Sequence, residues 1–102
     1  ENRATFRIEQ RRDFAGAISD CSKAIELSPK SFDAYNKRGF ARQQDGDLVG
    51  AITDYTTAIE LNPNFALAYS NRGSARKATG DRLGAIDDLD RALQLAAPRT
   101  RK

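Results

Sequence analysis

The fold is decided by one stretch of the sequence, Ala51-Ile52-Thr53-Asp54-Tyr55-Thr56-Thr57-Ala58-Ile59-Glu60-Leu61. Close copies of it begin 34 residues earlier at Ala17-Ile18 and 34 residues later at Ala85-Ile86, and both copies keep the aspartate, the second alanine and the final leucine. Self-similarity at this period is typical of proteins built from helical repeats. A unit of this size cannot bury its hydrophobic face alone, so neighbouring units must stack. The sequence therefore predicts an all-α ladder of short helices.

Three such units fill nearly all of the 102 residues, which predicts one solenoid segment rather than several globular domains. We divide it into residues 1–29, 30–63 and 64–97, followed by a basic tail at residues 98–102. Hydrophobic residues make up 39% of the chain and charged residues 30%. This composition suits thin layers between stacked helices and does not suit a large central core.

Repeated turn residues mark the ends of the helices. Gly46-Asp47 and Gly80-Asp81 each pair a glycine that can end one helix with an aspartate that can cap the next. Prolines at positions 29 and 63 separate the units. Arg12-Asp13 stands at the equivalent place in the first unit, so we expect its turn to be the least regular. The predicted helices span residues 2–11, 13–27, 31–45, 47–61, 65–79 and 81–95.

Small residues recur near the start of each second helix, as Gly16-Ala17, Gly50-Ala51 and Gly84-Ala85. A glycine inside a helix costs about 1 kcal/mol relative to alanine, so its repetition indicates a contact that leaves no room for a side chain. We expect these positions to bring neighbouring helices close together.

The motifs of the second unit resemble those of the tetratricopeptide repeat family, in its variant with Tyr-x-x-Arg-Gly in the first helix. The matching residues are Tyr35-Asn36-Lys37-Arg38-Gly39, Gly46-Asp47, Ala51-Ile52, Asp54-Tyr55, Ala58-Ile59 and Leu61-Asn62-Pro63. The third unit repeats most of them, and the resemblance covers residues 1–97 as three tandem repeats. The first unit departs most, because Ala4 and Thr5 replace the Arg-Gly pair.

The resemblance implies antiparallel helix pairs stacked into a right-handed superhelix, with a concave groove that holds a peptide or a helix of a partner. The residues that match groove-lining positions are Asn36, Lys37, Phe40, Gln43, Gln44, Leu67, Ser70, Asn71, Ser74 and Lys77, and Asn2 and Phe6 would join them. The family's two-carboxylate clamp for chaperone tails needs Lys, Asn, Asn, Lys and Arg. This sequence has Asn2, Phe6, Lys37, Leu67 and Asn71 at those positions, so we do not expect chaperone tails to bind.

Charge divides between the two helices of each unit, because the expected first helices are basic and the second helices are acidic. A basic inner layer favours an acidic partner segment. Pairing between the layers would instead neutralise the same charges, and both interpretations remain open at this point. The repeats suggest pairs that run forward along the chain, Asp20 with Arg38 and Asp54 with Arg72. The alternative is pairing within each repeat, which would leave Asp20 without an arginine. Arg42 and Arg76 are expected to cover apolar surface with their stems while their heads reach water.

The inventory of reactive residues argues against catalysis. The chain has no histidine, one cysteine, and no glycine-rich phosphate loop or metal-ligand cluster. Cys21 falls where the other units have Tyr55 and Leu89, which predicts a small core residue. We therefore expect no enzyme activity, cofactor, metal or small-molecule substrate. No apolar run could span a bilayer and no secretion signal is visible, which favours a cytoplasmic protein without a membrane partner.

Two other kinds of partner compete with a separate protein. The tail Pro98-Arg99-Thr100-Arg101-Lys102 suggests nucleic acid, but the net charge of +3 and the few aromatic residues make that the weaker candidate. The last helix carries apolar residues at an uncapped end, which allow self-association: Leu83, Ile86, Leu89 and Leu93. The chain starts at Glu1 rather than methionine, as we expect of a piece of a longer protein. The sequence thus predicts a protein-interaction scaffold.

Overall fold

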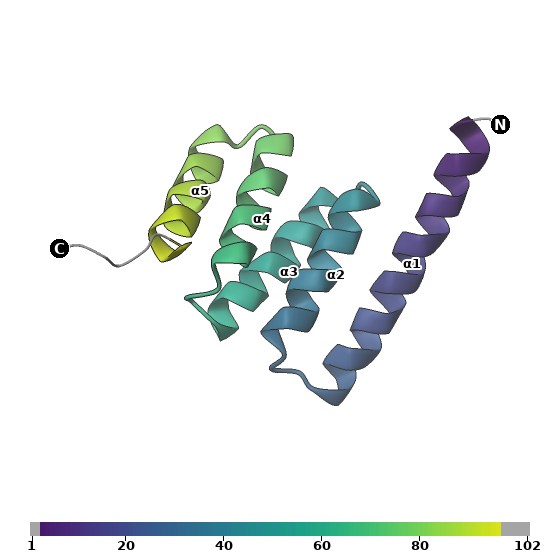
Figure 1. The fold of residues 1–102 in the computed structure, drawn as a ribbon, viewed down its shortest axis with the longest axis horizontal. Coiled ribbons are helices and arrows are strands. Elements are labelled where there is room, and N and C mark those ends of the chain that lie inside the picture. Colours follow the sequence, from purple (N-terminus) through teal and green to yellow (C-terminus); the bar gives the residue numbers. More distant parts are fainter. Residues whose placement is uncertain (1–2, 97–102) are drawn as a thin grey trace.

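The computed structural model describes the backbone of residues 3–96 and the side chains of residues 13–96. Every element in this range is an α-helix, as predicted. The helices are α1 (Arg3–Leu27), α2 (Phe32–Gln44), α3 (Leu48–Leu61), α4 (Ala66–Ala78) and α5 (Arg82–Ala96). They follow one another in chain order and each contacts the next, which makes an open ladder rather than a closed bundle (Figure 1).

The two complete helix pairs, α2 with α3 and α4 with α5, are joined by the predicted glycine-aspartate turns. Gly46 and Gly80 have φ angles of 94° and 93°. Glycine adopts this left-handed region without the strain that a Cβ would cause. Asp47 and Asp81 then cap the following helices, because each carboxylate accepts from the backbone N–H three residues later, at 2.9 and 3.0 Å. The turn residues therefore determine where both pairs fold back.

The predicted first pair, with helices at residues 2–11 and 13–27, is wrong, because residues 3–27 form the single helix α1. Arg12 holds the position of Gly46 and Gly80. The left-handed conformation costs such a residue about 1–2 kcal/mol, whereas continuing the helix keeps its backbone hydrogen bonds. The N-terminal end of α1 consequently extends past the end of α2 instead of folding back (Figure 1).

Close packing between α2 and α3 depends on one glycine of α2. Ala51, Tyr55 and Ala75 form a buried cluster with no exposed surface. A Cβ added to Gly39 would lie 2.7 Å from the ring of Tyr55 and 3.1 Å from the carbonyl oxygen of Ala51. Glycine is therefore required where α2 packs on α3, and this contact positions the α2 side chains described below.

The glycines that were expected to bring helices together have a different role. Gly50 and Gly84 lie against the carboxylates of Asp47 and Asp81, which cap their own helices. Gly16 has nothing within 4 Å of the place where a Cβ would stand. The predicted interhelix contact is thus wrong at Gly16 and Gly50, whereas a Cβ at Gly84 would also lie 3.0 Å from the Arg76 side chain of α4. The other small residues that matter between helices are alanines and the glycine that follows the repeated arginine.

A second cluster joins the two pairs at the proline-containing connection. Ala58, Ile59 and Ala68 are buried between α3 and α4. Phe32 and Phe65 lie beside this cluster, and their rings meet edge to face with centroids 5.0 Å apart. Such aromatic pairs add to the stabilisation from buried area. The ladder is therefore continuous from α2 to α5.

Candidate functional site

A buried aspartate of α3 binds two arginines of α2. Asp54 is 1% exposed. Its carboxylate accepts from Nε and Nη2 of Arg38 at 2.9 and 2.8 Å, and from Nη1 of Arg42 at 3.0 Å. Nη1 of Arg38 donates to the hydroxyl of Ser22 at 3.2 Å. One guanidinium therefore links α2 to both α3 and α1, and its bidentate bonds fix the relative position of the helices.

The last helix pair repeats this cluster. Asp88 accepts from Arg72 at 2.9 and 2.8 Å and from Arg76 at 3.0 Å, and Arg72 also donates to the Thr56 hydroxyl at 3.2 Å. The predicted forward pairing is therefore wrong, because each arginine binds the aspartate of its own pair. The glycine after each arginine explains this result, since it brings the first helix close to the second helix of the same pair.

The tyrosine three residues before each arginine completes the cluster. The guanidinium carbon of Arg38 lies 5.6 Å from the centroid of the Tyr35 ring, and that of Arg72 lies 5.7 Å from the Tyr69 ring. A cation over an aromatic face is attracted by the ring quadrupole. The Tyr-x-x-Arg-Gly pattern therefore has a structural role in both complete pairs.

Internal pairing uses much of the positive charge of α2 and α4. All four arginines described above bind Asp54 or Asp88. Arg42 and Arg76 keep 27% of their side chains exposed, so they contact water as expected, but their heads also bind the buried aspartates, which was not expected. Lys37 pairs at 3.2 Å with an exposed aspartate one turn earlier. Pairing between the layers is confirmed for the four arginines, which leaves less positive charge for an acidic partner.

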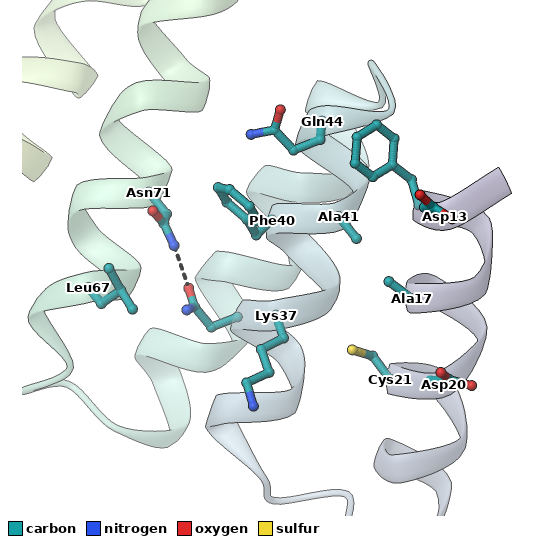
Figure 2. Close-up of a pocket in the computed structure, with 12 residues that line it drawn as sticks. Asp13, Ala17, Asp20, Cys21, Lys37, Phe40, Ala41, Gln44, Leu67 and Asn71 are labelled. Carbon is teal, nitrogen blue, oxygen red and sulfur yellow. Dashed lines mark hydrogen bonds between the residues drawn. The ribbon is translucent and has the colours of Figure 1, made fainter. Parts of the chain in front are cut away.

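A pocket with a cavity volume of about 720 Å³ opens between α1, α2 and α4 (Figure 2). Its walls are mostly apolar. Six of the ten predicted groove residues line it: Asn36, Lys37, Phe40, Gln44, Leu67 and Asn71. Phe40 and Leu67 are 48% and 54% exposed, although both are large and apolar. The structure thus brings most of the predicted set to one cavity.

The floor of this pocket is an amide pair. Asn36 is buried, and its Oδ1 accepts from Nδ2 of Asn71 at 3.1 Å, the dashed line in Figure 2. The bond joins α2 to α4, the two helices that the resemblance assigned to the groove. On α2, the exposed ring of Phe40 is the main apolar side chain that a ligand could contact.

The other four predicted groove residues lie elsewhere. Gln43 donates through Nε2 to the Ser74 hydroxyl at 3.2 Å and accepts from the Tyr55 hydroxyl at 2.7 Å, so it connects α2, α3 and α4 internally. Ser70 lines a second pocket, of about 580 Å³, between α4 and α5. Lys77 is exposed and lines neither pocket. Asn2 and Phe6 lie outside the residues whose side chains the structure describes.

One wall of the larger pocket was not predicted, because it comes from α1. Phe14, Ala17 and Cys21 contribute to it, together with Asp13 and Asp20. Figure 2 shows Ala17 and Cys21 pointing toward α2. The expected helix at residues 2–11 would have covered this wall. Cys21 was predicted to be a core residue because it aligns with Tyr55 and Leu89. Cys21 is only half-buried in the structure.

Cys21, in the α1 wall of the larger pocket, is a free thiol. Burial raises the pKa of the Cys21 thiol, an effect that Lys37 and Arg38 oppose. The thiol is therefore protonated and weakly nucleophilic at neutral pH. Among the residues that the structure describes, no three potential metal ligands gather in one place. None of the helices between residues 3 and 96 has both the length and the apolar character to cross a membrane.

Tyr55 gives the stability a pH dependence in the alkaline range. Burial, with a smaller effect of the Asp54 charge, raises the pKa of Tyr55 above its ordinary value of 10.0. Between the unfolded and folded pKa values the unfolded chain binds fewer protons, so the free energy of unfolding falls as the pH rises above about 10. Urea unfolding from about pH 8 to about pH 11 measures this slope. Tyr55→Phe should flatten it, and equal slopes would contradict the assignment.

The described chain is a helical repeat protein with a mostly apolar pocket beside its first helices. A family model described as TPR repeat matches residues 44–80. No curated protein matches the chain. The crystal structure of MamA is 32% identical, with a TM-score of 0.76 over 90% of this chain and 52% of that chain. The chain thus spans about half the length of MamA.

Two other similar structures are of complexes, and one of them contains a peptide. The first TPR of Spaghetti (RPAP3), bound to the HSP90 peptide SRMEEVD, is 28% identical, with a TM-score of 0.81 over 82% of this chain and 67% of that chain. The TPR2B domain of yeast Sti1, in its pHsp70 complex, is 26% identical, with a TM-score of 0.82 over 90% of this chain and 82% of that chain. With the repeat pattern, these matches place the chain in the tetratricopeptide repeat family.

Proposed function

We propose that this chain is a non-catalytic scaffold that binds a peptide or a helix of a partner protein along α2 and α4. The proposal rests on the pocket between α1, α2 and α4. Phe40 and Leu67 lie in its mostly apolar walls and remain exposed to solvent. Large apolar side chains in a concave site are common anchors for a ligand. The HSP90 peptide bound by the first TPR of Spaghetti and the pHsp70 complex of the Sti1 domain support this class of ligand.

An acidic ligand remains our proposal for the part of the groove that carries lysines. Lys37 lines the pocket, and Lys77 is exposed in the last turn of α4. The α1 wall carries Asp13 and Asp20 instead, so we expect acidic ligand residues only toward α2 and α4. Leu67 stands where the chaperone clamp needs a lysine, and we expect the peptide SRMEEVD to bind weakly for this reason.

The binding test uses a fluorescent peptide selected from an acidic peptide library, with a neutral counterpart and SRMEEVD beside it. Phe40→Ala should weaken binding about fivefold or more in fluorescence anisotropy, since truncating an aromatic anchor commonly costs over about 1 kcal/mol. Val49→Ala is the matched control, because Val49 is a 74% exposed apolar residue of α3 that lines neither pocket. Equal losses for the two variants, or no binding of any peptide, would overturn the proposal.

A second candidate function is stacking of the chain through α5, in a larger repeat protein or with itself. Leu93 is 68% exposed, whereas Ile59, one period earlier, is 9% exposed under α4. The second pocket lies beside Leu93. Sedimentation over a range of concentrations, compared between the wild type and Leu93→Gln, tests this candidate. Nucleic-acid binding is the weaker candidate, since the net charge is only +3 and aromatic residues are few; the basic tail that suggested it lies outside the described residues.

A further inference from the structure

One face of α1 is open where the equivalent face of α3 is covered. Asp54 and Tyr55 are 1% and 0% exposed in the pair that α3 forms with α2. One period earlier, Asp20 is exposed and Cys21 is half-buried, and both line the larger pocket. Among the helices of residues 3–96, only α2 contacts α1, and it leaves this face open. We call it the open face of α1.

The helices that cover the equivalent faces share a short pattern. The sequence in α2 is Arg38-Gly39-Phe40-Ala41-Arg42, and in α4 it is Arg72-Gly73-Ser74-Ala75-Arg76. In both helices the first arginine binds the aspartate through two nitrogens and the second arginine binds it through one. A helix that fits the open face therefore needs two arginines one turn apart, with a small residue after the first.

The chain itself contains one more sequence of this kind, Arg3-Ala4-Thr5-Phe6-Arg7. Arg3 precedes Asp20 by 17 residues, whereas the first arginine of α2 or α4 precedes its aspartate by 16. The segment is therefore shifted by one residue from the 34-residue period. Alanine replaces the glycine, and the opposing residue is correspondingly smaller. A Cβ on Gly39 would lie 2.7 Å from the ring of Tyr55, whereas α1 has Cys21 at the position of that tyrosine. Charge and size both match this segment to the open face.

The continuous α1 helix keeps this segment away from the open face of its own chain. Ala4 and Cys21 both belong to α1, so they are about 26 Å apart along its axis. We propose that residues 3–11 of one copy dock on residues 13–27 of a second copy, and the reverse, as an antiparallel pair of α1 helices. Arg3 and Arg7 of each copy then bind Asp20 of the other, which completes the cluster that Asp54 and Asp88 already have.

Along the helix axis, the register of this pair is consistent with two-fold symmetry. If Arg3 lies opposite Asp20 of the second copy, the two-fold axis crosses α1 between residues 11 and 12. Both contacts then form at once, as a two-fold interface requires. Arg11 and Arg12 meet their symmetry mates near the axis, and salt screens this repulsion. The docked segment covers the α1 wall of the larger pocket, so the pairing narrows the site of the proposed function while the pocket walls on α2 and α4 remain.

Disulfide trapping tests the pairing, because Cys21 is the only natural cysteine. A disulfide requires Cα atoms within about 7 Å. Ala4→Cys should give a covalent dimer under mild oxidation at physiological ionic strength, visible on a non-reducing gel, and mass analysis should find residue 4 linked to residue 21 between chains. Gln10→Cys is the matched control in the same segment. It should give no bond to Cys21, because residue 10 faces residue 13 in the proposed register, about 12 Å from Cys21 along the pair. The two introduced cysteines lie near the two-fold axis, so mass analysis of the linked residues is the readout.

Two results would overturn the pairing. One is the absence of a disulfide between residues 4 and 21. The other is that disulfide within one chain, which would mean that residues 3–11 fold back on their own α1 helix. Asp20→Asn in the Ala4→Cys background should slow the cross-linking about tenfold, and an unchanged rate would remove the arginine-aspartate contact from the proposal. Circular dichroism of each variant verifies the helical fold. Peptide binding measured on the same samples separates a failure of pairing from a failure of the proposed function.

Discussion

Replacing Asp54 with asparagine is expected to lower the free energy of unfolding by about 3 kcal/mol. The Asp54 side chain is 2% exposed, and it pairs with Arg38 and Arg42, whose side chains are 17% and 27% exposed. Asparagine keeps the shape of the side chain but removes its charge and turns an acceptor oxygen into a donor that faces N–H groups. We place the effect at the lower end of the range for buried pairs because both arginines keep some contact with water.

Urea unfolding followed by circular dichroism measures this effect, with two matched variants. Asp33→Asn makes the same chemical change in an exposed pair with Lys37, whose side chains are 55% and 67% exposed, so it should cost under about 1 kcal/mol. Asp88→Asn repeats the buried change in the last helix pair. It should cost less than Asp54→Asn, since α3 is packed between α2 and α4 whereas α5 contacts only α4. Equal costs for Asp54→Asn and Asp33→Asn would mean that the buried cluster does not stabilise the fold.

The sequence predicted the turns correctly where glycine, the residue that readily adopts a left-handed conformation, is present. Gly46 and Gly80 adopt the left-handed turn that their glycine-aspartate pairs indicated, and the period fixed the order of the helices. The prediction failed at Arg12, because a strict reading of the period assigned a turn to a residue that pays a conformational cost for it. A repeat pattern shows which positions correspond, but each copy still needs the residues that make its own turn.

The charged pairs and the pocket were harder to predict. The sequence showed that Arg38 and Asp54 recur, but which copies pair depends on how closely Gly39 brings α2 to α3, which is a property of packing. Most predicted groove residues line the pocket because they share one side of α2 and α4. The α1 wall with Cys21 was missed for a related reason, since a helix that would have covered it does not form.

Exchanging glycine for alanine is expected to change stability in opposite directions at two positions. Gly16→Ala should raise the free energy of unfolding by about 1 kcal/mol, because alanine is the better helix former and nothing lies within 4 Å of the new methyl group. Gly39→Ala gains the same helix preference but overpacks the core. Its methyl would lie 2.7 and 2.8 Å from two ring carbons of Tyr55, and such overpacking costs about 1–3 kcal/mol.

The net sign at Gly39 depends on whether the ring of Tyr55 can move. The ring has no exposed surface and its hydroxyl is bonded to Gln43 at 2.7 Å, so we expect it to stay and Gly39→Ala to lose about 1–2 kcal/mol in urea unfolding. Gly73→Ala is the matched variant in α4, where the nearest side-chain atom is a carbon of Leu89 at 3.1 Å, and it should cost less. A stabilising Gly39→Ala would mean that the ring yields, and that helix preference rather than close approach governs this position.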